Sequence, residues 1–163
     1  PMQFVGFVEG TDIGAGTGYF SFRLSRAVPQ GKVYAEDIQQ EMLDTIAARK
    51  AKGEGANIVT VLGGIVDPRL PANAIDLILL VDVYHEFSFP KEMGQAMVRA
   101  LKPGGRIALV EYRGEDPLVP IKEVHKMTEA QAKKEMSALG LAWVSTDSTT
   151  LPWQHLMIFA KGN

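Results

Sequence analysis

Residues 12–18, Asp-Ile-Gly-Ala-Gly-Thr-Gly, place three glycines at alternate positions directly after an acidic side chain. Glycine has no Cβ and tolerates positive φ, so this turn can bend sharply and let a ligand approach the backbone closely. A dinucleotide-binding fingerprint requires a glycine three residues after the second one, where this chain has Tyr19. The spacing therefore indicates a ligand-binding turn and disfavours NAD as the ligand.

His85 is the strongest candidate for acid–base chemistry. It follows the nearly continuous apolar run of residues 74–83, which is typical of a strand buried on both faces. Imidazole exchanges protons near neutral pH, and Asp82 or Glu86 is close enough in sequence to orient it. The alternative interpretation is that His85 bonds a neighbouring loop and fixes the wall of a pocket.

Four other side chains are predicted to meet a substrate at the same edge of a sheet. The run of residues 106–112 predicts a strand, and Arg113, just after it, suits a substrate carboxylate or a local acid such as Glu115. If the final strand is reversed, its start brings a tryptophan to this edge, as a substrate wall or a hydrophobic plug. The predicted substrate-binding residues are Tyr84, Glu111, Arg113 and Trp153.

The composition excludes several classes of function. A chain of 163 residues is expected to form one domain, over residues 1–163, and the absence of cysteine excludes disulfides, thiolate metal sites and cysteine nucleophiles. His85, His125 and His155 lie far apart without ligand spacing, so no metal site is predicted. A net charge of −2 argues against nucleic-acid binding.

We expect a cytoplasmic protein, because no apolar run has the roughly 20 residues of a membrane span and no signal-peptide pattern is present.

The elements that must position these residues alternate between strand and helix. Apolar and β-branched runs predict strands over residues 7–11, 32–36, 57–62, 74–83 and 106–112. Helical spacing follows the glycine turn, covers residues 40–52, and returns from Pro90 to Leu101. This order predicts an α/β fold with a doubly wound, mostly parallel sheet, in which ligands bind at the carboxyl ends of the strands.

The end of the chain predicts one more helix and a hairpin. Thr128 with Gln131 forms a capping box for a helix that runs to Leu139, with Gly140 just after its end. The strands expected over residues 141–146 and 155–160 are separated by a segment too short to hold a helix. The two strands should therefore be antiparallel.

Four segments, in this order, resemble the class I methyltransferases that use S-adenosylmethionine (SAM). They are residues 12–18, 33–38, 77–87 and 101–106. The resemblance covers nearly the whole chain and is closest to the small-molecule group that includes the ubiquinone/menaquinone methyltransferases. It implies a Rossmann-like sheet of order 3-2-1-4-5-7-6 with an antiparallel strand seven, SAM as cofactor, and methyl transfer to a small-molecule acceptor. Members of the family generally carry an N-terminal helical segment over the site, so a short or missing cover is expected here.

The resemblance also implies which residues bind the cofactor. Asp37 would accept hydrogen bonds from both ribose hydroxyls, although its position also permits a helix N-cap, and Asp12 would hold the methionine end. Ile38 would pack on adenine, and Tyr19 would stand near the sulfonium or pack on the sheet. The full predicted set is Asp12, Gly14, Gly16, Gly18, Tyr19, Asp37, Ile38, Gly64 and Asp82, with His85 as the catalytic residue.

The chain departs from the family pattern at several points, and two of these, the interrupted first strand and the short or missing N-terminal cover, keep a second hypothesis open. The acid that class I enzymes often carry after the third strand is replaced by Leu62-Gly63-Gly64, which leaves backbone groups at Gly64 to meet the adenine amine. Glu9 and Gly10 interrupt the first strand. The signature of methyltransferases that act on base or protein amide nitrogens is absent. The alternative to a small-molecule methyltransferase is a SAM-binding regulatory or scaffolding module without catalysis.

Overall fold

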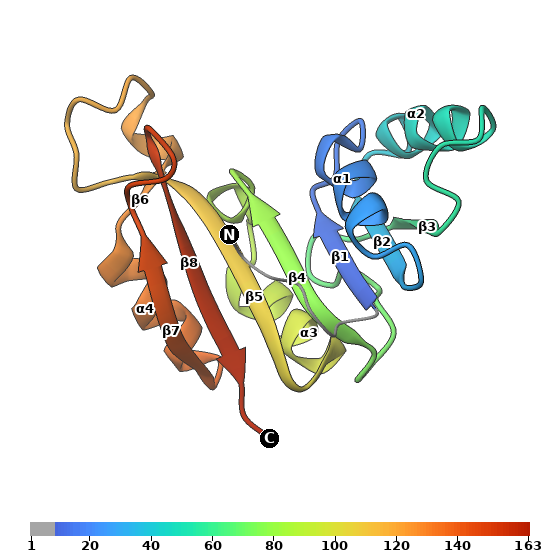
Figure 1. The fold of residues 1–163 in the computed structure, drawn as a ribbon. Coiled ribbons are helices and arrows are strands. Elements are labelled where there is room, and N and C mark those ends of the chain that lie inside the picture. Colours follow the sequence, from blue (N-terminus) through green and yellow to red (C-terminus); the bar gives the residue numbers. More distant parts are fainter. Residues whose placement is uncertain (1–8) are drawn as a thin grey trace.

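The computed structural model describes residues 9–163, which form one sheet with helices on both faces (Figure 1). The order of the strands along the sheet is β3-β2-β1-β4-β5-β8-β7, and β6 pairs with β5 beside this path. All pairs are parallel except β5 with β8 and β7 with β8. The strands are β1 (Glu9–Ile13), β2 (Lys32–Asp37), β3 (Ile58–Leu62), β4 (Ile75–Val81), β5 (Leu101–Arg113), β6 (Lys126–Met127), β7 (Leu141–Asp147) and β8 (Gln154–Lys161).

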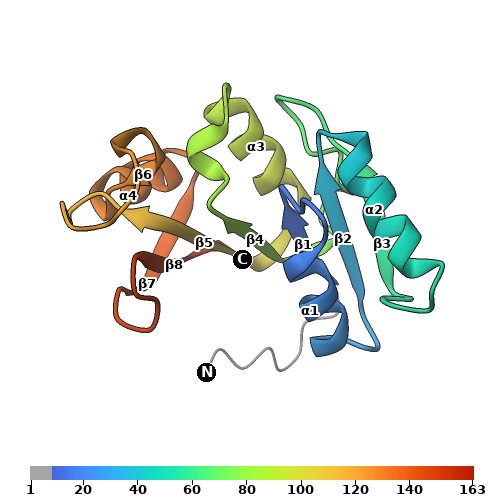
Figure 2. The same ribbon diagram turned by 90° about the horizontal axis from the view of Figure 1, so that it is seen from above.

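The helices divide between the two faces of the sheet. Figure 2 shows α1 and α3 on opposite sides of it. Phe22 of α1 and Ile46 of α2 pack with Val33 of β2, whereas Met97 of α3 and Met136 of α4 pack with Phe159 of β8 on the other face. The helices are α1 (Tyr19–Ala27), α2 (Gln40–Lys50), α3 (Pro90–Ala100) and α4 (Glu129–Ala138), with the 3₁₀ turns η1 (Tyr84–Glu86) and η2 (Glu123–His125).

The predicted α/β class and strand order are confirmed. Once the two-residue β6 is set aside, the observed order is the expected 3-2-1-4-5-7-6 with an antiparallel strand next to β5. The strand β6 has no counterpart in the sequence analysis, because two residues carry no periodicity. No helix in the described part of the chain is long and apolar enough to cross a membrane.

The interrupted first strand forms in spite of Glu9 and Gly10. It covers Glu9–Ile13, later than the predicted residues 7–11, of which residues 7 and 8 lie outside the described part of the chain. Gly10 is buried between its partners Val33 of β2 and Leu77 of β4, so a small residue suits this central position. The expected N-terminal cover also falls on residues that the structure does not describe.

The helix α4 begins and ends at the predicted residues. Thr128 Oγ1 accepts a hydrogen bond of 3.1 Å from the backbone N–H of Gln131, which satisfies one of the free donors of the first turn. Gly140 follows with φ of 82°, a conformation that favours glycine at the end of a helix. Local hydrogen bonding therefore determines both boundaries.

Candidate active site

The glycine turn joins β1 to α1 at the carboxyl edge of the parallel strands. Gly14, Gly16 and Gly18 have φ values of 69°, 52° and 87°, which side chains rarely adopt. A Cβ on Gly14 would lie 2.5 Å from Val83 Cγ2, so the turn packs closely on the chain that follows β4. The positive φ values confirm the predicted sharp bend of the backbone. The approach of a ligand to this turn stays a prediction.

Two acidic side chains at the end of β2 hold the glycine turn. Asp37 accepts hydrogen bonds of 2.9 Å from the backbone N–H of Gly16 and from that of Gln39, at the entry to α2. Glu36 Oε2 accepts a hydrogen bond of 3.4 Å from the backbone N–H of Gly14. Its other oxygen, Oε1, is buried without a hydrogen-bond partner in the described chain. Burial raises the pKa of Glu36 to about 8, and the charges of Asp37 and Asp12 add to the shift.

Asp12 is buried beneath the turn, 2% exposed. Its Oδ2 accepts a 2.6 Å hydrogen bond from the hydroxyl of Ser21 on α1. Burial raises the pKa of Asp12 to about 6, against the opposing effect of the Ser21 hydrogen bond. The side chain therefore ties the turn to the first helix, and contact with the methionine end of a cofactor stays a prediction.

A cavity of about 400 Å³ opens beside these carboxylates, within the range of small-molecule sites. Its charged lining is acidic: Glu36 and Asp37 from β2, and Glu86 from η1. None of the described residues that line it is basic. The remaining lining residues are mainly apolar. They are Ile13, Gly14, Ile38, Gln39, Ile65, Val83, Phe87, Ser88 and Met93.

His85 lies next to this cavity, in the turn η1 that follows β4. Its Nδ1 is 2.6 Å from Oε2 of Glu111, which is fully buried at the end of β5. The other oxygen of Glu111 accepts a 2.8 Å hydrogen bond from the backbone N–H of Tyr84. Burial raises the pKa of Glu111, while its hydrogen bond with His85 opposes this shift. Glu111, which the sequence analysis did not expect as a partner, fixes the imidazole at Nδ1, and the expected Glu86 meets the ring at Nε2.

The Nε2 atom of His85 faces a second histidine and a glutamate. It lies 3.2 Å from Nδ1 of His125 and 3.2 Å from Oε1 of Glu86. His125 comes from η2, in the long connection between β5 and α4 that projects from the carboxyl edge (Figure 1). No local pattern in the sequence predicts the contact between His85 and His125, because His125 lies in an irregular segment with no periodicity.

Three of the predicted substrate-binding residues have partners within the protein. Tyr84 is buried and donates its hydroxyl to Glu135 of α4, at 2.8 Å. Glu111 is buried behind His85. The guanidinium of Arg113 donates to the backbone carbonyls of residues 148, 151, 152 and 154, so it holds the loop between β7 and β8. These contacts position the site, and direct substrate binding stays a prediction for all three.

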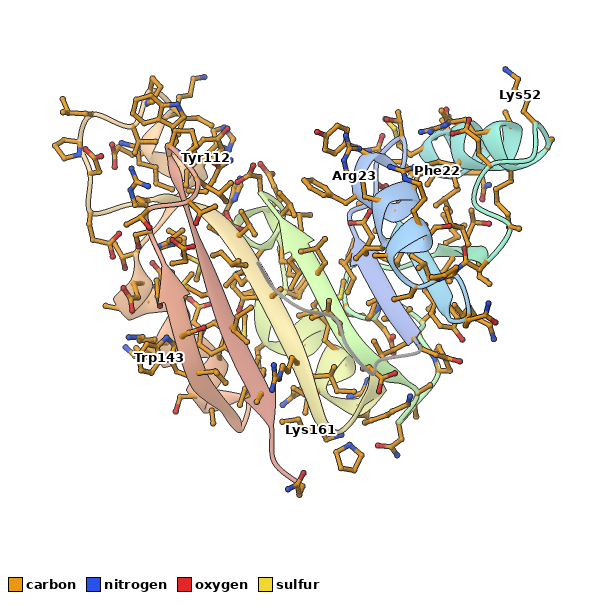
Figure 3. All side chains as sticks on the ribbon, viewed as in Figure 1. Phe22, Arg23, Lys52, Tyr112, Trp143 and Lys161 are labelled. Carbon is orange, nitrogen blue, oxygen red and sulfur yellow. The ribbon has the colours of Figure 1, made fainter. Side chains whose placement is uncertain are left out.

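Trp153 and Tyr19 are the exposed aromatic candidates. Trp153 is 41% exposed in the loop before β8, and Tyr19 is 58% exposed at the start of α1. The guanidinium of Arg23 lies 3.5 Å from the centroid of the Tyr19 ring. Figure 3 shows Arg23 on α1 and Tyr112 at the end of β5 at the same edge of the molecule.

The remaining predicted cofactor residues differ in their distance from the cavity. Ile38 lines it and is 55% exposed. Gly64 donates its N–H to the carbonyl of Asp67, 2.8 Å away, and does not line it. Asp82 has φ of 51° and accepts a 3.1 Å hydrogen bond from the amide of Gln154, which the reversed β8 brings to this edge.

Glu36 is the cavity residue that the sequence analysis missed. It is only 2% exposed, and a Cβ on Gly63 would lie 1.6 Å from its Oε1. The carboxylate therefore occupies the space that a side chain at the end of β3 would need. The available signal was a second acidic residue, directly before Asp37, at the end of a strand whose earlier buried positions are Val33 and Ala35.

Comparisons of the sequence with known proteins all point to methyltransferases. Residues 11–105 match the family model described as a methyltransferase domain. An uncharacterized methyltransferase-like protein of Schizosaccharomyces pombe is 28% identical over 132 residues, which are 81% of this chain and 49% of that protein. A ubiquinone/menaquinone biosynthesis C-methyltransferase of Pseudomonas putida is 32% identical over 103 residues, which are 62% of this chain and 40% of that protein. The chain thus spans about half the length of these relatives, or less.

The fold has solved counterparts as well. The structure of a SAM-dependent methyltransferase from Aquifex aeolicus superposes with a TM-score of 0.86 and 22% sequence identity. The match covers 94% of this chain and 81% of that one. At this level of identity the likeness establishes the architecture.

Proposed function

The chain belongs to the methyltransferase-domain family, and we propose that it transfers the methyl group of SAM to a small-molecule acceptor. The observation that carries this proposal is the acidic cavity beside the glycine turn. Two buried carboxylates and no basic side chain, among the described lining residues, suit a ligand that carries a sulfonium and an ammonium group. A dinucleotide would instead bring a pyrophosphate, which requires donors or positive charge.

The residues of the cavity fit the parts of SAM. Asp37 is placed to accept hydrogen bonds from the ribose hydroxyls, which are charge-assisted when the carboxylate is ionised. Oε1 of Glu36 can form a further hydrogen bond with the cofactor, which would satisfy a buried oxygen that has no partner in the described chain. Ile38, Ile65 and Val83 supply apolar surface for adenine and for the acceptor.

SAM supplies a methyl group that its sulfonium already activates for displacement. The contribution of the protein is then mainly alignment, worth at best roughly 7 to 11 kcal/mol of the barrier. Glu111 fixes the orientation of the His85 ring through Nδ1, and the electron pair of Nε2 lies on the side of His125 and Glu86. That electron pair is the group of this chain placed to act on an acidic proton or an oxygen of the acceptor.

Calorimetric titration with SAM and with NAD⁺ tests the cofactor, and release of S-adenosylhomocysteine with a panel of quinols, phenols and carboxylic acids tests catalysis. We expect SAM to bind, NAD⁺ not to bind, and at least one acceptor to give turnover. Binding of NAD⁺ without SAM would refute the proposal. Binding of SAM without turnover of any acceptor would favour the non-catalytic module instead.

A pair of glycine variants controls for folding. Gly14→Ala introduces a Cβ only 2.5 Å from Val83 at a residue with φ of 69°, so it should abolish measurable SAM binding. Gly162→Ala has no atom within 4 Å of the new Cβ and should bind SAM like the wild type. Equal affinity for SAM in both variants would show that the glycine turn is not part of the cofactor site.

A further inference from the structure

The side chains of His85, Glu86 and His125 form a cluster at the mouth of the cavity. Their ligand atoms are His85 Nε2, Glu86 Oε1 and His125 Nδ1, and the three distances between these atoms are 3.2, 3.2 and 3.3 Å. The atoms thus stand at the corners of a nearly equilateral triangle. The hydrogen bonds that hold η1 and η2 together use the same atoms.

The geometry points to a divalent transition-metal ion, with zinc as the reference case, bound by His85, Glu86 and His125. A tetrahedral ion with bonds of about 2.0 to 2.1 Å separates its ligand atoms by about 3.3 Å. The triangle has this size without any movement of the three residues. Two imidazoles and one carboxylate are the ligand types that suit zinc, iron(II) and cobalt(II), whereas magnesium and calcium prefer oxygen alone.

Glu111 supplies the outer partner that such a site requires. Metal-binding histidines generally donate their second ring N–H to a carboxylate or carbonyl, which fixes the tautomer and the ring orientation. Glu111 Oε2 accepts this hydrogen bond from His85 Nδ1 at 2.6 Å, and its other oxygen is held by the backbone N–H of Tyr84. The carboxylate is fully buried, so it is not free to turn away.

Exposure and charge allow an ion to enter and remain. The side chain of His85 is 10% exposed, while those of His125 and Glu86 are 37% and 60% exposed, so the site is anchored on one side and open on the other. Three carboxylates surround it: Glu86, Glu111 and Asp82, which interacts electrostatically with His85. Lys126, next to His125, is paired with Glu123 at 2.6 Å. Three protein ligands leave a fourth position, as in zinc sites that act on a substrate.

The fourth position gives the ion a function. Glu86 lines the cavity as well as the metal triangle, so an ion there would lie at the wall of the cavity and could bind an oxygen of the acceptor. This role rests on the proposed methyl transfer, whereas the binding of the ion does not. With the ion bound, the electron pair of His85 Nε2 is donated to the metal, and polarisation of the acceptor oxygen by the ion would replace the action of His85 as a base.

Titration of chelator-treated protein with Co²⁺ and Zn²⁺, without SAM or acceptor, tests the site. We expect one equivalent of Co²⁺ with the visible absorption of a tetrahedral complex, displaced by one equivalent of Zn²⁺. His125→Ala should weaken Zn²⁺ binding by at least about a hundredfold, and Glu111→Gln by about 10- to 100-fold through the outer partner. Glu41→Gln, at an exposed acidic side chain of α2 that is not a ligand, should bind like the wild type.

Two outcomes would overturn the proposal. One is no binding of stoichiometric Zn²⁺ by the wild type, and the other is equal affinity in wild type and His125→Ala. SAM titration of the same samples separates this proposal from the proposed function, since His125 does not line the cavity and its variant should keep the affinity for SAM within about twofold. Binding of Zn²⁺ without binding of SAM would support the metal site and contradict the proposed methyltransferase function.

Discussion

Asp37 performs two structural tasks with one carboxylate and is free to perform a third. Its two oxygens hold the N–H groups of Gly16 and Gln39, and the side chain lines the cavity. The interpretations of this residue as a ribose ligand and as a cap at the entry to α2 are therefore compatible. A carboxylate oxygen can accept more than one hydrogen bond, so a bound ribose need not displace either backbone contact.

We expect Asp37→Ala to weaken SAM binding by about 10- to 100-fold, because one charge-assisted pair of hydrogen bonds is lost. Calorimetric titration measures the change. The matched control is Asp44→Ala on the exposed side of α2, which removes only a contact with Gln40. If Asp37→Ala binds SAM as tightly as Asp44→Ala does, the residue is only a cap.

Glu36 makes the stability of the protein depend on pH. Its folded pKa of about 8 exceeds the ordinary value of 4.5, so the folded state holds the proton more tightly than the unfolded state does. The stabilisation is complete below about pH 4.5 and is lost as the pH rises through 8, with a slope of at most roughly 1.4 kcal/mol per pH unit. Above pH 8 the carboxylate of Glu36 is ionised while it is buried, which destabilises the folded state.

The variant Glu36→Gln should therefore gain stability relative to the wild type as the pH rises. Urea unfolding at pH 5, 7 and 9 measures this difference between the two proteins, in both of which Asp12, whose pKa is also raised, titrates. The free-energy difference should grow from pH 5 to 9 in favour of the variant. A difference that does not change with pH would show that Glu36 is not buried as a titrating acid.

Among the elements, α4 is the one whose start depends most visibly on a single side chain. Thr128→Ala removes the hydrogen bond to the N–H of Gln131, and the loss of such a cap costs about 1 kcal/mol of unfolding free energy. Urea unfolding measures the loss. Thr45→Ala in α2, which removes an exposed hydrogen bond to a helix carbonyl, is the control and should change stability by less than half as much. Equal losses would argue against a specific cap.

The sequence predicted the elements that carry local signals and missed those that do not. Thr128, Gln131 and Gly140 delimit α4 by hydrogen bonds within a few residues, so they are visible in the sequence. The pairing of β6 with β5 depends on contacts at long sequence separation, which no local pattern encodes. The predicted first strand overlaps β1 over residues 9–11, but its end was set early because the pairing that carries β1 on to Ile13 is with the distant strands β2 and β4.

The same distinction applies to the site. The spacing within one segment predicted the sharp bend of the glycine turn, and the family resemblance pointed to Asp37, which contacts this turn and lines the cavity. The contacts of His85 with Glu111 and His125 join residues 26 and 40 positions apart and became apparent only in the folded chain. The structural partners of Arg113 were missed for the same reason, since they are backbone carbonyls of a distant loop.

At the scale of the whole molecule, the cavity connects the two cores on either side of the sheet. Ile13 and Met93 belong to the core under α3 and α4, whereas Ile38 and Gln39 lead into α2, which packs in the other core. A ligand in the cavity contacts segments from both. Its binding energy should therefore stabilise the molecule as one cooperative unit.

We expect SAM at about 100 times its dissociation constant to add about 2.7 kcal/mol to the free energy of unfolding. For a domain of this size, this raises the melting temperature by roughly 5 to 10 °C, as measured by calorimetry. NAD⁺ at the same concentration and the Gly14→Ala variant with SAM are the controls, and neither should show the rise. A similar rise with NAD⁺ would contradict the specificity of the cavity.

The way in which Arg113 holds the loop before β8 bears on how new acceptors could be acquired. All its contacts in that loop are with backbone carbonyls, which every amino acid provides. The loop can therefore exchange its side chains, Trp153 included, without losing its anchor. Under the proposed function, the side chains of this loop can diverge while its anchor stays intact, so the loop is a natural place for evolution, or for directed libraries, to change the acceptor.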